Sequence, residues 1–380
     1  MTTLLAPERR DPERTYPSYS RPLVVRLLAT REFAVFALLV GVFLYATANV
    51  EFFDGPLTLY FLFRDLAPVL VVALPMTLII MTGEIDLSVA STMGLSAVVM
   101  AMLHFDAGWS VPAAAAVAVV VGTLCGAFNG FLVAYVGLPS LAVTIGTLAL
   151  FRGIAVGLTG TTQYTGFPQE WRDLALDRIS EGSRFPLVLV PIGILSVLFL
   201  VLLHFTTFGR GVFEIGLNDE AARFTGVNVE RTKFLLFIMA GAVAAMAGIY
   251  FALIYNSARG NTAEGTELKV IAAVLLGGVS IFGGRGALPG VIAGALLIGV
   301  LSSALRLESV EDNQINIIIG VLLILSVVSG SLLASLRGLL RRLHWRGSAP
   351  PPPDLPGEPG PTAPPGATTR TTVADGSSRP

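Results

Sequence analysis

Few residues of this sequence have the type and spacing that chemistry requires. The single cysteine, Cys125, has no partner for an intramolecular disulfide, and the three histidines, His104, His204 and His344, are too widely spaced for a metal-binding motif. Neither of the two lysines follows the pattern G-x-x-x-x-G-K-[ST] that holds nucleotide phosphates. We therefore expect no catalytic residue, no metal site and no cofactor bound by this chain.

Two carboxylates, Glu84 and Asp86, lie in the segment GEIDLS between two apolar runs. A charged side chain at the centre of a bilayer costs on the order of 2.5–3.5 kcal/mol, so we expect both carboxylates to be interfacial or paired. Either Asp86 or Ser88 simply caps the following helix, or this turn forms a cytoplasmic gate or a contact with a partner ATPase.

Four polar residues interrupt apolar segments further along the chain. Arg152 is the least expected, because its guanidinium lies within an otherwise apolar run. It could donate hydrogen bonds to a sugar or an acidic partner, snorkel partly to the outer interface, or pair with a neighbouring helix. Asn129, Thr144 and Thr147 either line a polar path or form hydrogen bonds between helices.

The loop 208–232 contains the signals of a short helix of its own. Asn218 is a good N-cap, because its side-chain oxygen can accept from the first free amides of the helix. Glu220 follows in the first turn, where the helix dipole favours negative charge, and Arg223 lies near the other end. Gly226 can supply the left-handed residue that ends the helix.

Small residues set the expected surface and placement of this helix. Ala221 and Ala222 would give it a smooth face, and Gly211 and Gly216 would hold it away from the rest of the protein. Such a helix fits a groove on a partner protein, or it is simply a well-capped helix in a loop.

The composition indicates that membrane helices position these residues. Apolar residues make up 53% of the 380-residue chain and charged residues 13%, against about 25% charged residues in soluble domains. A crossing helix needs about 20 mostly apolar residues. Cutting the chain at charges, prolines and glycine clusters predicts ten spans, at 34–50, 66–82, 88–104, 112–136, 140–159, 186–206, 233–256, 270–283, 287–305 and 315–335. The third and the eighth are short enough to be re-entrant.

The predicted spans define a transmembrane domain over 34–335 between two flanking segments. Residues 1–33 precede it, and residues 336–380 are first basic and then proline-rich, a composition expected to be disordered. Lysines and arginines near the helix ends place both termini in the cytoplasm. The chain has 25 basic and 26 acidic residues, so nothing favours binding to nucleic acid, whereas its apolar surface implies contact with membrane lipid.

Several segments resemble the permease subunits of ABC importers of the ribose, xylose, rhamnose and autoinducer-sugar type. The coupling loop of those permeases follows roughly G-x-N-x-x-A-A-x-x-x-G-[IV], and these positions are occupied here by Gly216, Asn218, Ala221, Ala222, Gly226 and Val227. GEIDLS resembles their GGIDLSVG segment, and residues 139–156 and 277–301 resemble two later segments. The chain departs from the family at Glu84, Ala90 and Leu217, and in its proline-rich tail.

The resemblance implies an all-α, type II ABC importer-like bundle of about ten helices in the bacterial inner membrane. It implies a dimer with a second copy or a paralogue, and two separate ATPase subunits that bind ATP and magnesium. A periplasmic or lipid-anchored binding protein would deliver a monosaccharide. The expected ATPase-coupling residues are Gly216, Asn218, Glu220, Ala221, Ala222, Arg223 and Gly226. The expected path or gate residues are Asp86, Asn129, Thr144, Thr147 and Arg152.

Other functions remain open from the sequence. A permease for branched-chain amino acids or nucleosides would have a similar coupling loop. An ion-coupled secondary transporter would need paired carboxylates within its spans, and no such pair is visible. A membrane-embedded enzyme would need a motif such as H-E-x-x-H or G-x-S-x-G, and the sequence has neither.

Overall fold

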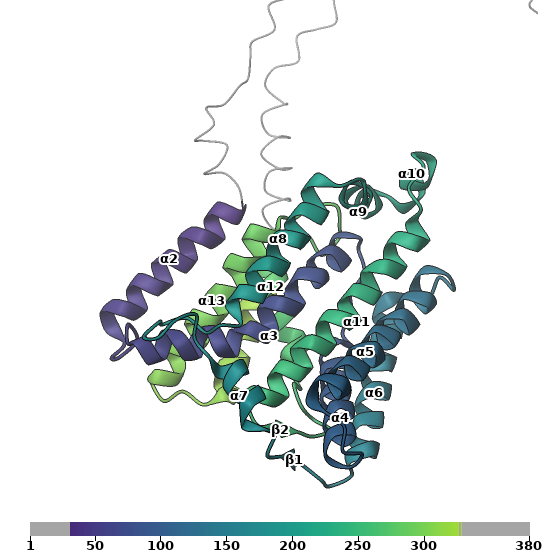
Figure 1. Cartoon of the computed structure of the whole chain (residues 1–380). Helices are drawn as coiled ribbons and strands as arrows, with labels where there is room; N and C mark the ends of the chain where they lie inside the picture. The colour runs from purple at the N-terminus through teal and green to yellow at the C-terminus, as the bar shows by residue number, and fades with distance from the viewer. Residues whose placement is uncertain (1–30, 327, 329–380) are drawn as a thin grey trace, which may run out of the picture. The chain divides into compact units, whose positions relative to one another are not determined.

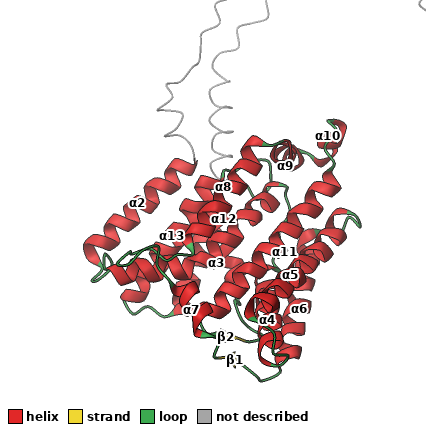
Figure 2. Cartoon of the chain, viewed as in Figure 1, coloured by secondary structure: helices red, strands yellow, loops and turns green. Residues whose placement is uncertain are grey.

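The structure is a computed structural model that describes residues 31–326 and 328, all within one compact unit. The segment before residue 31 and the tail 336–380 lie outside the described residues, so the expectations for them are untested. Figures 1 and 2 show the described part as a bundle of helices with one two-stranded sheet.

The helices follow one another with short connections. Their bounds are α2 Arg31–Asn49, α3 Pro56–Met81, α4 Val89–Phe105, α5 Val111–Ala134, α6 Ser140–Thr159, α7 Gln169–Leu176, α8 Leu189–Phe205, α9 Thr207–Leu217, α10 Asp219–Phe224, α11 Val229–Ile254, α12 Thr266–Leu276 and α13 Leu288–Leu307. A further apolar helix covers Asp312–Ser326. The strands β1 (Tyr164–Thr165) and β2 (Ser257–Ala258) pair antiparallel.

Each of the ten predicted spans overlaps a helix, and the prediction of a helical, multi-pass membrane protein is confirmed. Within the described residues, five helices are long and apolar enough to cross a membrane, namely α3, α5, α6, α11 and α13. The number becomes six if α8 and α9, which meet at an angle of 68°, form one broken span. The count of ten crossings and the cytoplasmic placement of the termini therefore stay predictions.

The helix α3 corrects one predicted boundary, because it begins at Pro56 and not at residue 66. The charges of Arg64 and Asp65 suggested an interruption there. In the structure these neighbours form an ion pair of 2.7 Å, and the Arg64 guanidinium lies 4.7 Å from the centre of the Phe61 ring. The helix therefore accommodates both charges without ending.

A second boundary is corrected at α12, which ends at Leu276, seven residues before the predicted end. The loop that follows contains Gly278, Gly283 and Gly284, all with positive φ. Such left-handed backbone is accessible to glycine and cannot continue an α-helix.

The glycines of α5 allow it to pack closely against α11, and such small residues are typical of contacts between membrane helices. A Cβ atom added at Gly126 would overlap the carbonyl oxygen of Phe237, and one added at Gly122 would lie 2.7 Å from the carbonyl oxygen of Gly241. The α5 backbone therefore lies directly against α11.

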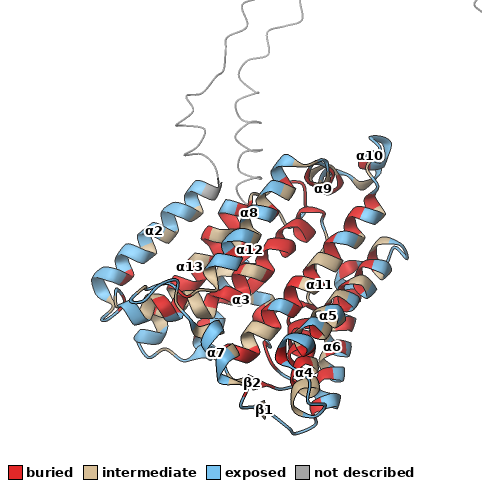
Figure 3. Ribbon diagram, viewed as in Figure 1, coloured by how far each residue is buried: buried red, intermediate tan, exposed pale blue. Residues whose placement is uncertain are grey.

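Burial is uneven across the bundle (Figure 3). In the most apolar window of α3, 78% of the residues are buried, whereas the corresponding windows of α5 and α6 are 33% and 28% buried. The helix α3 is therefore central, and α6 presents most of its apolar surface outward.

Two long helices, α3 and α11, have 26 residues each and are followed by a loop and a shorter helix. Residues 82–88 lead into α4, of 17 residues, and residues 256–265 lead into α12, of 11 residues. These two loops, called here the first and the second inter-helix loop, position the polar residues described next.

Candidate functional site

The short helix α10 has the capping predicted from its sequence. Asn218 is in the extended region, and its Oδ1 accepts from the amide of Ala221 at 2.8 Å. Glu220 lies in the first turn and Arg223 in the last, and Gly226 has a φ of 89°. In Figure 1, α10 stands at one end of the bundle.

The expected alanine face of α10 is corrected by the structure. Ala221 is exposed, but Ala222 is 2% exposed and packs with Ile215 and Val229 beneath the helix. The outward surface is instead completed by Phe224, whose exposure is 85%. One alanine therefore faces outward and the other fixes the helix to its support.

The expected role of Gly211 and Gly216 as spacers is also wrong, because both lie inside the regular helix α9. A Cβ atom at Gly216 would overlap the carbonyl oxygen of Met81, at the end of α3. The same carbonyl accepts from the amide of Gly284 at 2.9 Å. Gly216 thus allows α9 to lie directly on α3 and on the loop after α12.

Lys233 joins α10 to the first inter-helix loop. Its Nζ lies 2.6 Å from Oδ2 of Asp219, in the first turn of α10, and 2.7 Å from Oε1 of Glu84. The Lys233 side chain is only 10% exposed. This three-residue cluster, called here the Lys233 cluster, carries no local sequence signal, because its members are up to 149 positions apart.

The other end of α10 is also tied to its neighbours. Arg223 forms an ion pair of 2.5 Å with Glu230 of α11, and the Thr225 hydroxyl donates to Glu214 of α9 at 2.9 Å. Because both ends are held, α10 is attached to α9 and to the start of α11 as a unit.

A buried polar network lies in the first inter-helix loop. Oδ1 of Asp86 accepts from the amide and the hydroxyl of Ser88, at 2.9 and 2.7 Å, and Nδ2 of Asn129 donates to the Ser88 hydroxyl at 2.7 Å. Burial raises the pKa of Asp86 to about 6, because a carboxylate is poorly solvated there. Ser88 is the N-cap residue of α4, and its side chain makes no capping hydrogen bond, so the expected helix cap is replaced by a turn within the loop.

The helix α6 contacts both inter-helix loops. Near its start, the Ser140 hydroxyl accepts from the amide of Ile85 at 3.1 Å, and the Thr144 hydroxyl donates to the carbonyl of Ile85 at 3.2 Å. Twelve residues after Ser140, Nη1 of Arg152 donates to the carbonyls of Gly260 and Thr262, each at 2.8 Å.

These contacts show how the polar residues of the spans are held. Arg152 does not snorkel outward but holds the second inter-helix loop. Thr144 and Asn129 form hydrogen bonds between elements, whereas the Thr147 hydroxyl donates to Thr144 of its own helix at 3.4 Å. The structure thus brings Asp86, Asn129 and Thr144 to one loop and places Arg152 at the other.

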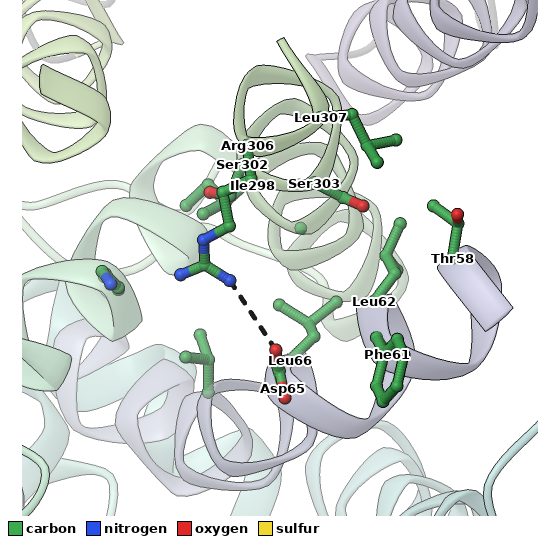
Figure 4. Close-up of a pocket in the computed structure, with 13 residues that line it drawn as sticks. Thr58, Phe61, Leu62, Asp65, Leu66, Ile298, Ser302, Ser303, Arg306 and Leu307 are labelled. Carbon is green, nitrogen blue, oxygen red and sulfur yellow. Dashed lines mark ion pairs between the residues drawn. The ribbon is translucent and has the colours of Figure 1, made fainter. Parts of the chain in front are cut away.

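A cavity of about 260 Å³ lies between α3, α12 and α13 (Figure 4). Asp65, Lys269 and Arg306 bring charges to it, and Ser302 and Ser303 bring hydroxyl groups. Nη1 of Arg306 lies 3.6 Å from Oδ2 of Asp65. None of these residues was expected as a site, because they come from three separated helices.

An apolar bundle with two helix-interrupting loops and a capped helix at one end defines a helical, multi-pass membrane protein. The chain belongs to the family described as "branched-chain amino acid transport system / permease component", whose model matches residues 58–327. This membership confirms the resemblance to ABC importer permeases.

Named relatives agree with the family. The autoinducer 2 import system permease protein LsrD of Klebsiella pneumoniae is 33% identical over 329 residues, which cover 85% of this chain and 97% of the relative. The LsrD proteins of Yersinia pseudotuberculosis and Photorhabdus luminescens are each 36% identical, over 308 and 309 residues, covering 79% of this chain and 91% of the relative. No solved structure shows significant similarity to the chain.

Proposed function

We propose that this chain is the transmembrane permease subunit of an ATP-driven importer of a small sugar related to autoinducer 2. Separate ATPase subunits would bind ATP and magnesium, a periplasmic or lipid-anchored binding protein would deliver the sugar, and a second permease copy or paralogue would complete the dimer. The family and the names of the relatives support this proposal.

The observation that carries the proposal is the placement of α10. The helix is exposed on Ala221 and Phe224, and its opposite side is packed on α9 and α11. Because this short helix is held at both ends, a partner that displaces it also displaces the helices to which it is attached. A flexible loop would deform instead. We assign the docking of the ATPase to this face, with Gly216, Asn218, Glu220, Ala222, Arg223 and Gly226 maintaining its form.

The Lys233 cluster then connects the docking helix to the solute path. Closure of the ATPase subunits would displace α10 and, through Asp219 and Lys233, would displace Glu84 in the first inter-helix loop. Asp86 follows Glu84 by two residues, and its network with Asn129 and Thr144 would serve as the gate on the ATPase side.

Arg152 and Thr147 lie further along α6, so this helix would link the two inter-helix loops while access alternates between the two membrane faces. ATP would act by favouring one of two pre-existing arrangements of the bundle. We place α10 and both termini in the cytoplasm and the chain in the bacterial inner membrane, with about ten crossings.

A branched-chain amino acid permease is the second candidate, because the description of the family names that solute. The names of the relatives and the GEIDLS segment favour a sugar. The two candidates differ in the solute that the complete transporter takes up, a sugar or a branched-chain amino acid.

Reconstitution tests the proposal. The permease, its ATPase and its binding protein are placed in liposomes, and uptake of labelled autoinducer 2, ribose and leucine is measured with and without ATP. We expect ATP-dependent uptake of a sugar only when all components are present. Uptake of leucine alone, or uptake by the permease alone under an ion gradient, would overturn the proposal.

A further inference from the structure

The cavity between α3, α12 and α13, called here the α3–α13 cavity, lies far from the docking helix. The end of α3 at Met81 contacts α9, whereas the cavity is lined by the first turns of α3, including Phe61 and Asp65. Asp65 and Met81 are 16 residues apart in one helix, which is about 24 Å along its axis. The cavity is therefore near the end of the bundle opposite α10, where an imported solute would arrive.

The polar groups of the cavity suit hydroxyl groups. Asp65 offers a carboxylate acceptor, Lys269 and Arg306 offer donors, and Ser302 and Ser303 can do both. The separation of 3.6 Å between Arg306 Nη1 and Asp65 Oδ2 exceeds a good charge-assisted hydrogen bond of about 2.7–2.9 Å. A ligand hydroxyl can therefore compete for both groups.

The arginines near the cavity are already paired with carboxylates. Arg306 is shared between Asp65 and Asp312, whose Oδ1 accepts from Arg306 Nε at 3.0 Å, and Asp65 also pairs with Arg64 at 2.7 Å. A phosphate would need these guanidinium groups and would be repelled by the neighbouring carboxylates. This pairing favours an uncharged ligand over a phosphorylated one.

The size and the lining of the cavity limit the class of ligand further. A volume of about 260 Å³ is below the roughly 300–1,000 Å³ of pockets for drug-sized ligands, so the ligand is small. In Figure 4, Phe61 and Leu66 lie beside Asp65 on α3, and Ile298 lies near Arg306 on α13. Apolar side chains on both sides can therefore contact the carbon skeleton of a solute while the polar groups between them bind its hydroxyl groups.

We propose that the α3–α13 cavity binds a small, uncharged, polyhydroxylated solute within a single permease subunit. This proposal rests on the proposed function. It adds a binding site for the sugar after the sugar leaves the binding protein. Asp65, Arg306 and Ser302 are its binding residues, and Ser303 lies beside them in the lining.

Cysteine protection tests the site directly, because Cys125 is the only native cysteine and is buried. In a Cys125→Ala background, Ser303→Cys is introduced into the full permease–ATPase complex in lipid nanodiscs, and its rate of reaction with a small maleimide is measured. Thr161→Cys, in the exposed loop after α6, is the matched control. Thermal unfolding of each variant reports whether the fold is kept.

We expect autoinducer 2 or ribose to slow the labelling of Ser303→Cys at least threefold and to leave Thr161→Cys unchanged. Ribose 5-phosphate and leucine are expected to protect neither position, and adding Asp65→Asn should abolish the protection. The proposal is overturned if the maleimide never reaches Ser303→Cys, if sugars give no protection, or if protection follows the lipid composition of the nanodisc. ATP-dependent sugar uptake without protection would reject this site and leave the importer function intact.

Discussion

Lys233 of α11 holds Asp219 of α10 at 2.6 Å, although Asp219 is 45% exposed and the lysine side chain only 10% exposed. The same ammonium group lies 2.7 Å from Glu84. A buried cation therefore joins α10 to the loop that contains the buried Asp86.

Replacing Lys233 with methionine should uncouple the transporter. The variant leaves the partly buried Glu84 without its cation. We therefore expect the free energy of unfolding to fall by about 2 kcal/mol, less than the 3–5 kcal/mol lost when a fully buried ion pair is broken. ATPase activity of the assembled complex should stay within twofold of wild type, while ATP-driven uptake falls at least tenfold. Arg231→Gln, which removes an exposed positive charge from the first turn of the same helix, is the control and should change uptake less than threefold. Equal uptake by the two variants would remove the cluster from the coupling route.

Gly126→Ala should separate α5 from α11. The added Cβ would overlap the Phe237 carbonyl oxygen, so we expect a destabilisation of about 1–3 kcal/mol, measured by thermal unfolding of the purified protein. Gly157→Ala makes the same change in α6, where a Cβ meets nothing within 4 Å, and should leave the melting temperature unchanged or raise it. Similar melting temperatures for the two variants would show that the α5–α11 packing is looser than described.

Asp86→Asn should remove a pH dependence of the stability of the folded protein. The pKa of Asp86 in the folded protein is about 6, above its ordinary value of 3.8, so the folded state keeps a proton that the unfolded state loses. The contribution of Asp86 to the free energy of unfolding is fully present below about pH 4. It falls by on the order of 3 kcal/mol as the pH rises to about 6. The amide retains the oxygen that accepts from Ser88.

Melting temperatures of the wild type and the Asp86→Asn variant, recorded between pH 4.5 and 7.5, check this sign. The wild type should lose stability relative to the variant as the pH rises to about 6, and the difference should then stay constant. A wild type that gains stability relative to the variant as the pH rises, or that shows no relative change between pH 4.5 and 6, would contradict the raised pKa.

Arg152→Met should loosen the second inter-helix loop. The substitution keeps an apolar stem of similar reach but removes both hydrogen bonds to Gly260 and Thr262. We expect amide hydrogen exchange across residues 256–265 to become at least tenfold faster, while exchange in the first inter-helix loop stays unchanged. Unchanged exchange at 256–265 would mean that other contacts hold this loop.

The sequence was sufficient to predict local features of the fold and of the site. The cap at Asn218 and the stop at Gly226 depend on neighbouring residues, and apolar runs mark the helices whatever they pack against. The predicted start of α3 was wrong because each charged residue was counted separately. In the structure Arg64 and Asp65 form an ion pair and neutralise each other.

Features that depend on distant residues could not be predicted. Which alanine of α10 faces outward depends on Ile215 and Val229, which pack against Ala222. Lys233 was visible only as a positive charge near a helix start, because its partners are 14 and 149 positions away. The α3–α13 cavity likewise combines residues from three helices.

Docking of the ATPase on α10 can be tested most directly with one substitution and its control. Ala221→Glu places a bulky charge on the exposed face of α10, and Thr161→Glu makes a comparable exposed change in the loop after α6. We expect the Ala221→Glu permease to keep its melting temperature but to lose both copurification of the ATPase and ATP-driven uptake, whereas Thr161→Glu keeps both. Retention of the ATPase and of uptake by Ala221→Glu would show that α10 is not the docking helix.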